Sequence, residues 1–147
     1  MVNTELAKAL RIIDANLNRS REGLRVCEEV MRFYLEDQAL AKEYKVLRHH
    51  ITGFIQTLDR PFSELLEARD VLNDVGKELD FSRTKDDSVI SSLFLANIER
   101  AKEALRVLEE FSKSYHLGDP SYFKTARYKL YALEKETIAK INAVRNS

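Results

Sequence analysis

The sequence has few residues that interrupt helices, with 4 glycines and 2 prolines among 147 residues. It has one cysteine, Cys27, which excludes an internal disulfide framework. No apolar run approaches the roughly 20 residues of a membrane-spanning helix, and the opening stretch MVNTELAKAL lacks the apolar core of a signal peptide. These absences predict a cytoplasmic protein that contacts no membrane.

A surplus of positive charge is also missing, because Lys plus Arg and Asp plus Glu both total 24. Proteins that bind nucleic acids usually cluster positive charge against the phosphates, so this balance argues against a nucleic-acid partner. The GxxxxGKS/T and GxGxxG nucleotide loops and the GxSxG hydrolase motif are absent as well. The three histidines have no zinc-site spacing.

Residues that favour helices are abundant instead, and the length suits one domain covering residues 1–147. We therefore predict an all-α fold. Caps or breakers at Asp37, at Asp87 or Ser88, at Gly118 and at Asp119-Pro120 separate the predicted elements. The predicted helices span about 4–35, 38–58, 63–68, 88–116 and 120–144. Residues 69–86 lack helical periodicity and are expected to form one long ordered loop.

An internal repeat is the most informative feature of the sequence. Residues 15–29 read ANLNRSREGLRVCEE and residues 96–110 read ANIERAKEALRVLEE, with nine of fifteen positions identical at an offset of 81. The following helices also match, since Tyr44-Lys45-x-x-Arg48 corresponds to Phe123-Lys124-x-x-Arg127. We interpret this as a duplicated helical hairpin, about 8–58 and 88–144. Two such hairpins would pair about a pseudo-twofold axis into a helical bundle.

Two inward-facing stripes are expected on the first helix of each repeat, at about 100° per residue. One is an apolar seam through Leu10, Ile13, Leu17, Ser20, Leu24, Cys27, Met31 and Tyr34. The second is apolar at its C-terminal half and polar at its N-terminal half. It comprises Asn16, Arg19, Gly23, Val26, Val30 and Phe33, and in the other copy Asn97, Arg100, Ala104, Val107 and Phe111.

The polar half of that stripe would bring two asparagines and two arginines together in one cavity. The planar guanidinium group of arginine can bind phosphate through two parallel hydrogen bonds. The candidates for a phosphate-binding site are therefore Asn16, Arg19, Asn97 and Arg100. A polar layer that only fixes the helix register explains them equally well. Glu22 and Glu103 at its edge suit either salt bridges with the arginines or a metal. Arg25 and Arg106 point outward, and Glu28, Glu29, Glu109 and Glu110 are expected on a solvated face.

The predicted loop offers a second group of candidates, in the run Arg69-Asp70-x-x-x-Asp74-Val75-Gly76. Mg²⁺ is commonly held by one or two carboxylates together with substrate phosphates, so Asp70 and Asp74 suit a magnesium site. Both are also common turn or cap residues, and that interpretation remains open beside the first.

The run IIDANLNRSREGLRVCEE at residues 12–29 resembles a known family, as do Lys45-x-x-Arg48, the 69–76 loop and the repeat copy at 96–110. This family is the helical domain found N-terminal to bacterial thiamine-phosphate synthase, and also as a free-standing protein. The resemblance covers about residues 8–135. Lys77 departs from it, because part of the family has threonine there. The synthase barrel itself needs far more chain than remains, so synthase activity is not expected.

The resemblance implies a kinase that uses ATP and Mg²⁺ to convert 4-amino-5-hydroxymethyl-2-methylpyrimidine phosphate into its diphosphate, in thiamine biosynthesis. It implies catalytic roles for Arg19, Arg69 and Arg100, and metal binding by Asp70 and Asp74. Substrate contacts are expected from Asn16, Asn97, Glu22, Arg48 and Arg127. Thiamine-phosphate synthase is an expected functional partner, and a homo-oligomer is compatible with the pattern. A non-catalytic module that binds a phosphorylated ligand or docks onto the synthase is the alternative.

Overall fold

The computed structural model describes residues 4–77 and 88–147, and within these ranges the chain is helical with no strand. The all-α prediction is confirmed. Residues 78–86 of the predicted loop, and Asp87 as a helix cap, lie outside the described residues. The helical segments are α1 (Thr4–Glu29), η1 (Val30–Tyr34), α2 (Gln38–Gly53), η2 (Phe54–Thr57), α3 (Phe62–Ala68), α4 (Val89–Tyr115) and α5 (Ser121–Arg145).

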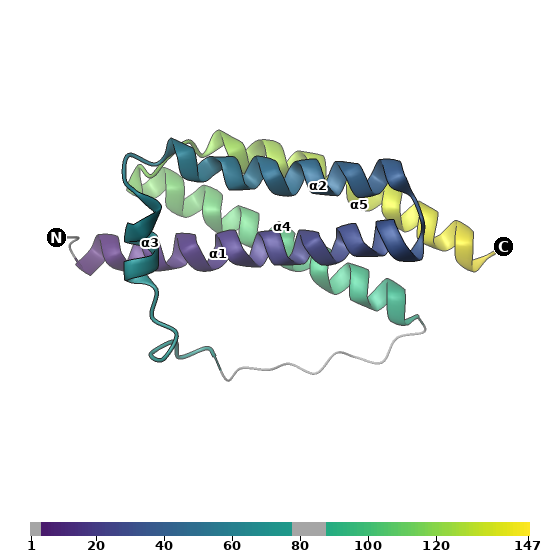
Figure 1. Cartoon of the computed structure of the whole chain (residues 1–147), viewed down its shortest axis with the longest axis horizontal. Helices are drawn as coiled ribbons and strands as arrows, with labels where there is room; N and C mark the ends of the chain where they lie inside the picture. Colours follow the sequence, from purple (N-terminus) through teal and green to yellow (C-terminus); the bar gives the residue numbers. More distant parts are fainter. Residues whose placement is uncertain (1–3, 78–87) are drawn as a thin grey trace.

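The four long helices form a bundle (Figure 1). α1 packs against both α2 and α4, and α5 packs against the same two helices from the other side. The short α3 lies across the N-terminal half of α1. The first turn of α1 and the last turn of α5 lie at opposite ends of the molecule. No helix among the described residues is long and apolar enough to cross a membrane.

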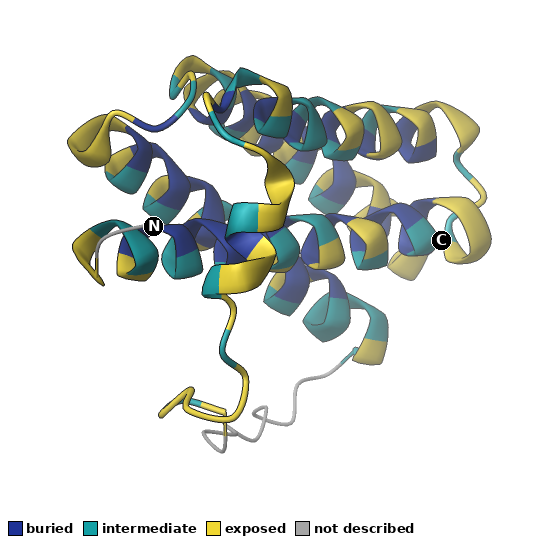
Figure 2. Ribbon diagram, turned by 60° about the vertical axis from the view of Figure 1, so that its left-hand side comes forward, coloured by how far each residue is buried: buried dark blue, intermediate teal, exposed yellow. Residues whose placement is uncertain are grey.

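The core is built from the inner sides of the four long helices, as the burial colouring in Figure 2 shows. Tyr44 from α2 and Phe94 from α4 meet edge to face, with ring centroids 6.5 Å apart. The Tyr44 hydroxyl also shares a hydrogen bond of 2.7 Å with Thr137 of α5, so this buried polar group is satisfied. Cys27 is fully buried, as the seam predicted.

The helix boundaries follow the predicted caps closely. The Asp37 carboxylate accepts a hydrogen bond from the Leu40 backbone N–H at 3.0 Å, and Asp119 accepts one from the Ser121 N–H at 3.0 Å. After α4, Gly118 has φ +63°, and a Cβ there would come within 2.6 Å of Phe54. Glycine is therefore required by both conformation and space at this turn.

The C-terminal end of the first helix differs from the prediction. Tyr34 and Phe33 were placed on inward stripes, yet they are 56% and 65% exposed. The helix widens into a π-helical turn at Val30–Tyr34, where the Leu35 N–H bonds to the Val30 carbonyl at 2.9 Å. The wider turn holds an extra residue, so the side chains that follow rotate away from the regular stripe.

α1 and α4 lie in close backbone contact at Gly23. A Cβ added to this glycine would lie 2.7 Å from the backbone carbonyl oxygen of Asn97. The absence of a side chain at Gly23 thus lets the two helix backbones cross in contact. The polar residues of the repeat lie beside this crossing.

Candidate functional site

A pocket of about 470 Å³ lies at the crossing of α1 and α4, and we call it the crossing pocket. Most of its lining comes in pairs that correspond at the offset of 81. The lining residues are Asn16, Arg19, Glu22, Gly23, Asn97, Arg100, Glu103, Ala104 and Val107. The structure therefore brings the two asparagines and two arginines of the repeat together, as the sequence pattern predicted.

The asparagines are held by their own helices. Asn16 Nδ2 donates to the Ile12 carbonyl at 2.9 Å, and Asn97 Nδ2 donates to the Leu93 carbonyl at 2.8 Å. Both residues are buried, and neither bonds to the other within the described part of the chain. A polar layer that fixed the register would instead join the two helices by such bonds. Within the described residues, neither amide oxygen accepts a side-chain or backbone hydrogen bond.

The arginines of the crossing pocket are exposed, not buried as the inward stripe suggested. Their long, flexible side chains can reach solvent from the lining of this pocket. Arg19 and Arg100 form no ion pair within the described residues, so the salt bridges that were one of two interpretations of Glu22 and Glu103 are not seen there. Two unpaired cations on one rim are suited to an anionic ligand.

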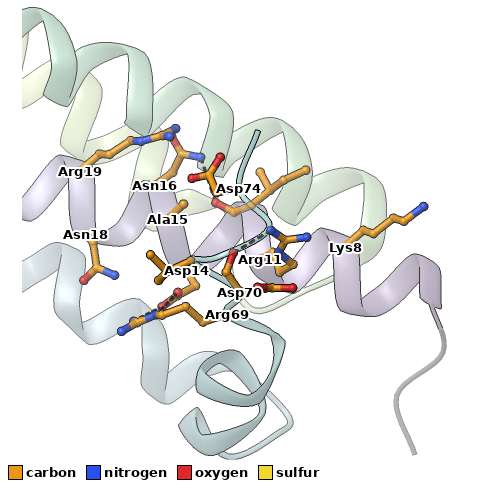
Figure 3. Close-up of a pocket in the computed structure, with 12 residues that line it drawn as sticks. Lys8, Arg11, Asp14, Ala15, Asn16, Asn18, Arg19, Arg69, Asp70 and Asp74 are labelled. Atoms are coloured by element: carbon orange, nitrogen blue, oxygen red, sulfur yellow. Dashed lines mark hydrogen bonds and ion pairs between the residues drawn. The ribbon is translucent and has the colours of Figure 1, made fainter. Parts of the chain in front are cut away.

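A second pocket of about 550 Å³ adjoins the first, and we call it the N-terminal pocket (Figure 3). It lies between the N-terminal half of α1 and the segment that follows α3. The pocket is lined by Lys8, Arg11, Ile12, Asp14, Ala15, Asn16, Asn18, Arg19, Arg69, Asp70, Val71 and Asp74. Asn16 and Arg19 line both pockets, so the two cavities share a wall.

Arg69 is fixed in this pocket by Asp14, as the dashed lines in Figure 3 show. Its Nε and Nη2 each donate to one Asp14 carboxylate oxygen at 2.7 Å. Asp14 is only 4% exposed, and its hydrogen bonds raise the pKa of the Arg69 guanidinium. The bidentate pair pins the end of α3 to α1. Arg11 adds a second link, because its Nη2 donates to the Asp70 carbonyl at 3.2 Å.

Asp14 is the residue that sequence reasoning missed. It lies between Leu10 and Leu17 at helical spacing, so it faces inward among apolar neighbours. A carboxylate in such a position needs a cationic or hydrogen-bonding partner, and the sequence alone indicates this need. The sequence does not indicate which residue is the partner, because Arg69 lies 55 residues further along the chain.

Asp70 and Asp74 both organise turns, which agrees with the structural interpretation left open above. Asp70 accepts hydrogen bonds from the side chain and backbone N–H of Asn73, and these bonds lower the pKa of Asp70. Asp74 Oδ1 accepts one from the Gly76 N–H at 2.9 Å. The described residues contain no group of three or more metal-type side chains. Asp70 and Asp74 line the same pocket, so a Mg²⁺ ion held there would take most of its ligands from phosphate and water.

The remaining predicted substrate contacts lie elsewhere. Arg48 pairs with Glu28 at 3.3 Å, and Arg127 pairs with Glu109 at 2.7 Å. Both pairs join the first helix of a repeat to its second helix, and neither arginine lines the two pockets. Glu28 and Glu109 were expected on a solvated face, yet they are 6% and 2% exposed because these arginines cover them. Glu29 and Glu110, the outer glutamates, pair with exposed Arg25 and Arg106.

Comparisons with known proteins identify relatives of most of the chain. The model of the ThiD2 family matches residues 11–136, a range that includes every residue lining the two pockets except Lys8. A thiamine-phosphate synthase from Synechocystis sp. is 46% identical over 127 residues, covering 84% of this chain and 34% of that protein. One from Rhodopirellula baltica is 35% identical over 136 residues, covering 92% and 36%. The chain thus spans about a third of the length of these relatives. No solved structure matches.

Proposed function

The chain belongs to the ThiD2 family, and from that premise we propose that it is an ATP- and Mg²⁺-dependent kinase of thiamine biosynthesis. Its substrate would be 4-amino-5-hydroxymethyl-2-methylpyrimidine phosphate and its product the corresponding diphosphate. The observation that carries this proposal is the pair of adjoining pockets with Arg19 in their common wall. Two phosphorylated ligands could lie there side by side with a cation between them.

The reaction joins two phosphates. An oxygen of the pyrimidine phosphate would attack the γ-phosphorus of ATP, and the bond from that phosphorus to the β–γ bridging oxygen would break. ADP would leave with the electron pair of that bond. The attacking group is already an anionic oxygen, so the protein must chiefly align the reactants and neutralise their repulsion.

Three arginines meet this need. Arg19 and Arg100 have exposed guanidinium groups without an ion-pair partner in the described residues, and they would bind phosphate oxygens. Arg69 uses Nε and Nη2 to hold Asp14, so its Nη1 remains to stabilise charge on the transferring group. Its exposure of 40% keeps that group accessible.

Asn16, Asn97 and Glu22 would contact the pyrimidine. Their oxygens can accept hydrogen bonds from its 4-amino group, and one amide N–H of each asparagine already donates to its own helix. Arg48 and Arg127 are not part of this proposal, since their guanidinium groups hold Glu28 and Glu109.

Asp70 and Asp74 would hold Mg²⁺ together with phosphate oxygens. The ion would neutralise charge on the nucleotide phosphates when bound. The chain's own contribution is to keep the two carboxylates near Arg11 and Arg69, through the turn at Asn73 and the pair with Asp14. Without a cation, these carboxylates would repel a bound polyphosphate.

The names of the relatives support the biosynthetic context. They are called thiamine-phosphate synthases, and this chain matches about a third of their length. A kinase that makes the pyrimidine diphosphate would supply the substrate of such a synthase, so the synthase is the proposed functional partner.

The test is to incubate the purified protein with ATP, Mg²⁺ and the pyrimidine phosphate, and to measure ADP and the pyrimidine diphosphate. Equal amounts of both products are expected, with none when any one reactant is omitted. Arg19→Ala serves as the control against a contaminating kinase. Tight binding of both ligands without turnover would contradict the kinase and favour a non-catalytic binding module.

A further inference from the structure

The two halves of the chain contribute equally to one pocket and unequally to the other. In the crossing pocket, each polar residue of α1 has an identical counterpart 81 positions later. These pairs are Asn16 with Asn97, Arg19 with Arg100 and Glu22 with Glu103. The crossing pocket is therefore nearly symmetric in its chemistry, with one cation, one amide and one carboxylate from each helix.

The N-terminal pocket has no such counterpart. The positions in α4 that correspond to Lys8, Arg11 and Asp14 are occupied by Val89, Ser92 and Leu95. The segment that begins at Arg69 closes this pocket over α1 alone. These charged residues thus occur in only one of the two copies of the repeat.

The added charges suit a polyphosphate with a divalent cation. Lys8, Arg11 and Arg19 are cations on this pocket that form no salt bridge among the described residues, although the charge of Arg11 helps to lower the pKa of Asp70. Asp70 and Asp74 are carboxylates near them, and Arg69 is already neutralised by Asp14. Several cations with two carboxylates match the triphosphate of a nucleotide with its Mg²⁺ better than they match a single phosphate.

The crossing pocket suits a smaller, less charged ligand. Its two arginines are balanced by two glutamates, so it offers no net positive charge to a triphosphate. A monophosphate can take both guanidinium groups, while the glutamates and the amide oxygens accept hydrogen bonds from an amino-substituted ring. At about 470 Å³ it can hold one small heterocycle with its phosphate.

We propose that the nucleotide binds with its polyphosphate in the N-terminal pocket and that the phosphorylated pyrimidine binds in the crossing pocket. Arg19, which belongs to both, then lies between the donor and acceptor phosphates. The assignment rests on the proposed function for the identity of the two ligands, and it goes beyond that function by giving each ligand its own cavity.

The repeat supplies the variants for a direct test. Arg11→Ser installs the residue found at the corresponding position of α4, and Arg100→Ser removes a cation that lines only the crossing pocket. Arg106→Ser, which changes an exposed arginine outside both pockets, is the matched control. Binding is measured by calorimetry for two separate ligands, a non-hydrolysable ATP analogue with Mg²⁺ and the pyrimidine phosphate. Circular dichroism melts verify that each variant is folded.

Arg11→Ser is expected to weaken binding of the ATP analogue by about tenfold or more, with little effect on the pyrimidine phosphate. Arg100→Ser should show the reverse, and Arg19→Ser should weaken both. A reversed pattern, or equal effects of Arg11→Ser on both ligands, overturns the assignment, even if the wild-type protein turns over. If the predicted division of binding appears without turnover in the wild type, the assignment stands and the kinase proposal fails.

Discussion

Glu109 shows how a buried charge is stabilised by its neighbours. Burial by itself raises the pKa of this carboxyl, but hydrogen bonds and charge from Arg127 and Lys113 outweigh it, and the pKa is lowered overall. A carboxylate with a lowered folded-state pKa stabilises the protein above its unfolded pKa, near 4.5. That stabilisation is lost as the pH falls through the lower, folded-state pKa.

Glu109→Gln should therefore destabilise the protein by about 3 kcal/mol at neutral pH, because it leaves the Arg127 charge without its carboxylate. Glu110→Gln, which breaks an exposed pair with Arg106, should change stability by less than about 0.5 kcal/mol. Chemical denaturation of both variants measures the difference. The difference in unfolding free energy between wild type and Glu109→Gln should become smaller as the pH is lowered from about 7 to about 3. A difference in unfolding free energy that does not depend on pH would contradict the role given to the Glu109–Arg127 ion pair.

Arg19→Ala and Arg100→Ala should each lower turnover by about two orders of magnitude or more, since a cation placed against transferring charge contributes about 3 kcal/mol to the transition state. Both side chains are exposed and unpaired in the described residues, so melting temperatures should change little. Arg106 is exposed and lines neither pocket, so Arg106→Ala should keep full activity. Large losses of stability with activity per folded molecule intact would show that the arginines are structural.

The site residues that the sequence revealed are the ones that occur twice. Asn16 and Arg19 stood out because Asn97 and Arg100 repeat them at the same helical spacing, and the structure places all four on one pocket. Repetition also marked Arg48 and Arg127, whose role proved to be pairing with buried glutamates. A repeated residue can serve the fold as well as a ligand, and only the packing of the second helix against the first decides which.

At the scale of helices, the crossing of α1 and α4 is set by Gly23. A methyl group there would lie 2.7 Å from the Asn97 carbonyl oxygen, a backbone atom that cannot move alone. Such overpacking costs about 1–3 kcal/mol, which offsets or exceeds the gain of about 1 kcal/mol from replacing glycine in a helix.

Gly23→Ala should thus lower stability or leave it unimproved, and it should weaken ligand binding at the crossing pocket by pushing Asn97 away. Gly53→Ala is the matched control, because its nearest neighbour is the movable Tyr122 ring at 3.3 Å. That variant should be neutral or stabilised by up to about 1 kcal/mol. Thermal melts compare the two, and a stabilised Gly23→Ala with normal binding would mean that the helices can separate at no cost.

Helix positions were predictable because local chemistry determines where a helix starts. Asp37 and Asp119 each bond to a backbone N–H of the first turn that follows, as their sequence positions suggested. The π-helical turn at Val30–Tyr34 has no comparable local signal. It depends on how the end of the first helix meets the next one, and so the exposure of Phe33 and Tyr34 was not foreseen.

On the scale of the whole molecule, the reactivity of Cys27 can be used to measure unfolding of the helical bundle. Its side chain is fully buried, and burial raises the pKa of the thiol to about 12. Because only an exposed thiolate reacts, labelling by a thiol reagent should require unfolding of the bundle. Labelling should be slow in the native protein and should accelerate with denaturant in parallel with the loss of helical signal.

Ligands that bind only the folded protein should slow this labelling further. The ATP analogue with Mg²⁺ and the pyrimidine phosphate together are expected to protect Cys27 more than either does alone. Fast labelling under native conditions, unaffected by ligands, would show that Cys27 becomes exposed through local motion instead.

Pockets that share a wall can be filled by a single molecule. If donor and acceptor bind on either side of Arg19, a compound that links adenosine to the pyrimidine through a continuous phosphate chain would span both cavities. Its second half would bind at the high effective concentration set by the first, so its affinity should exceed that of either half by a factor of about 10²–10⁴. The length of the phosphate chain that binds best would then measure the separation of the two reacting groups across Arg19.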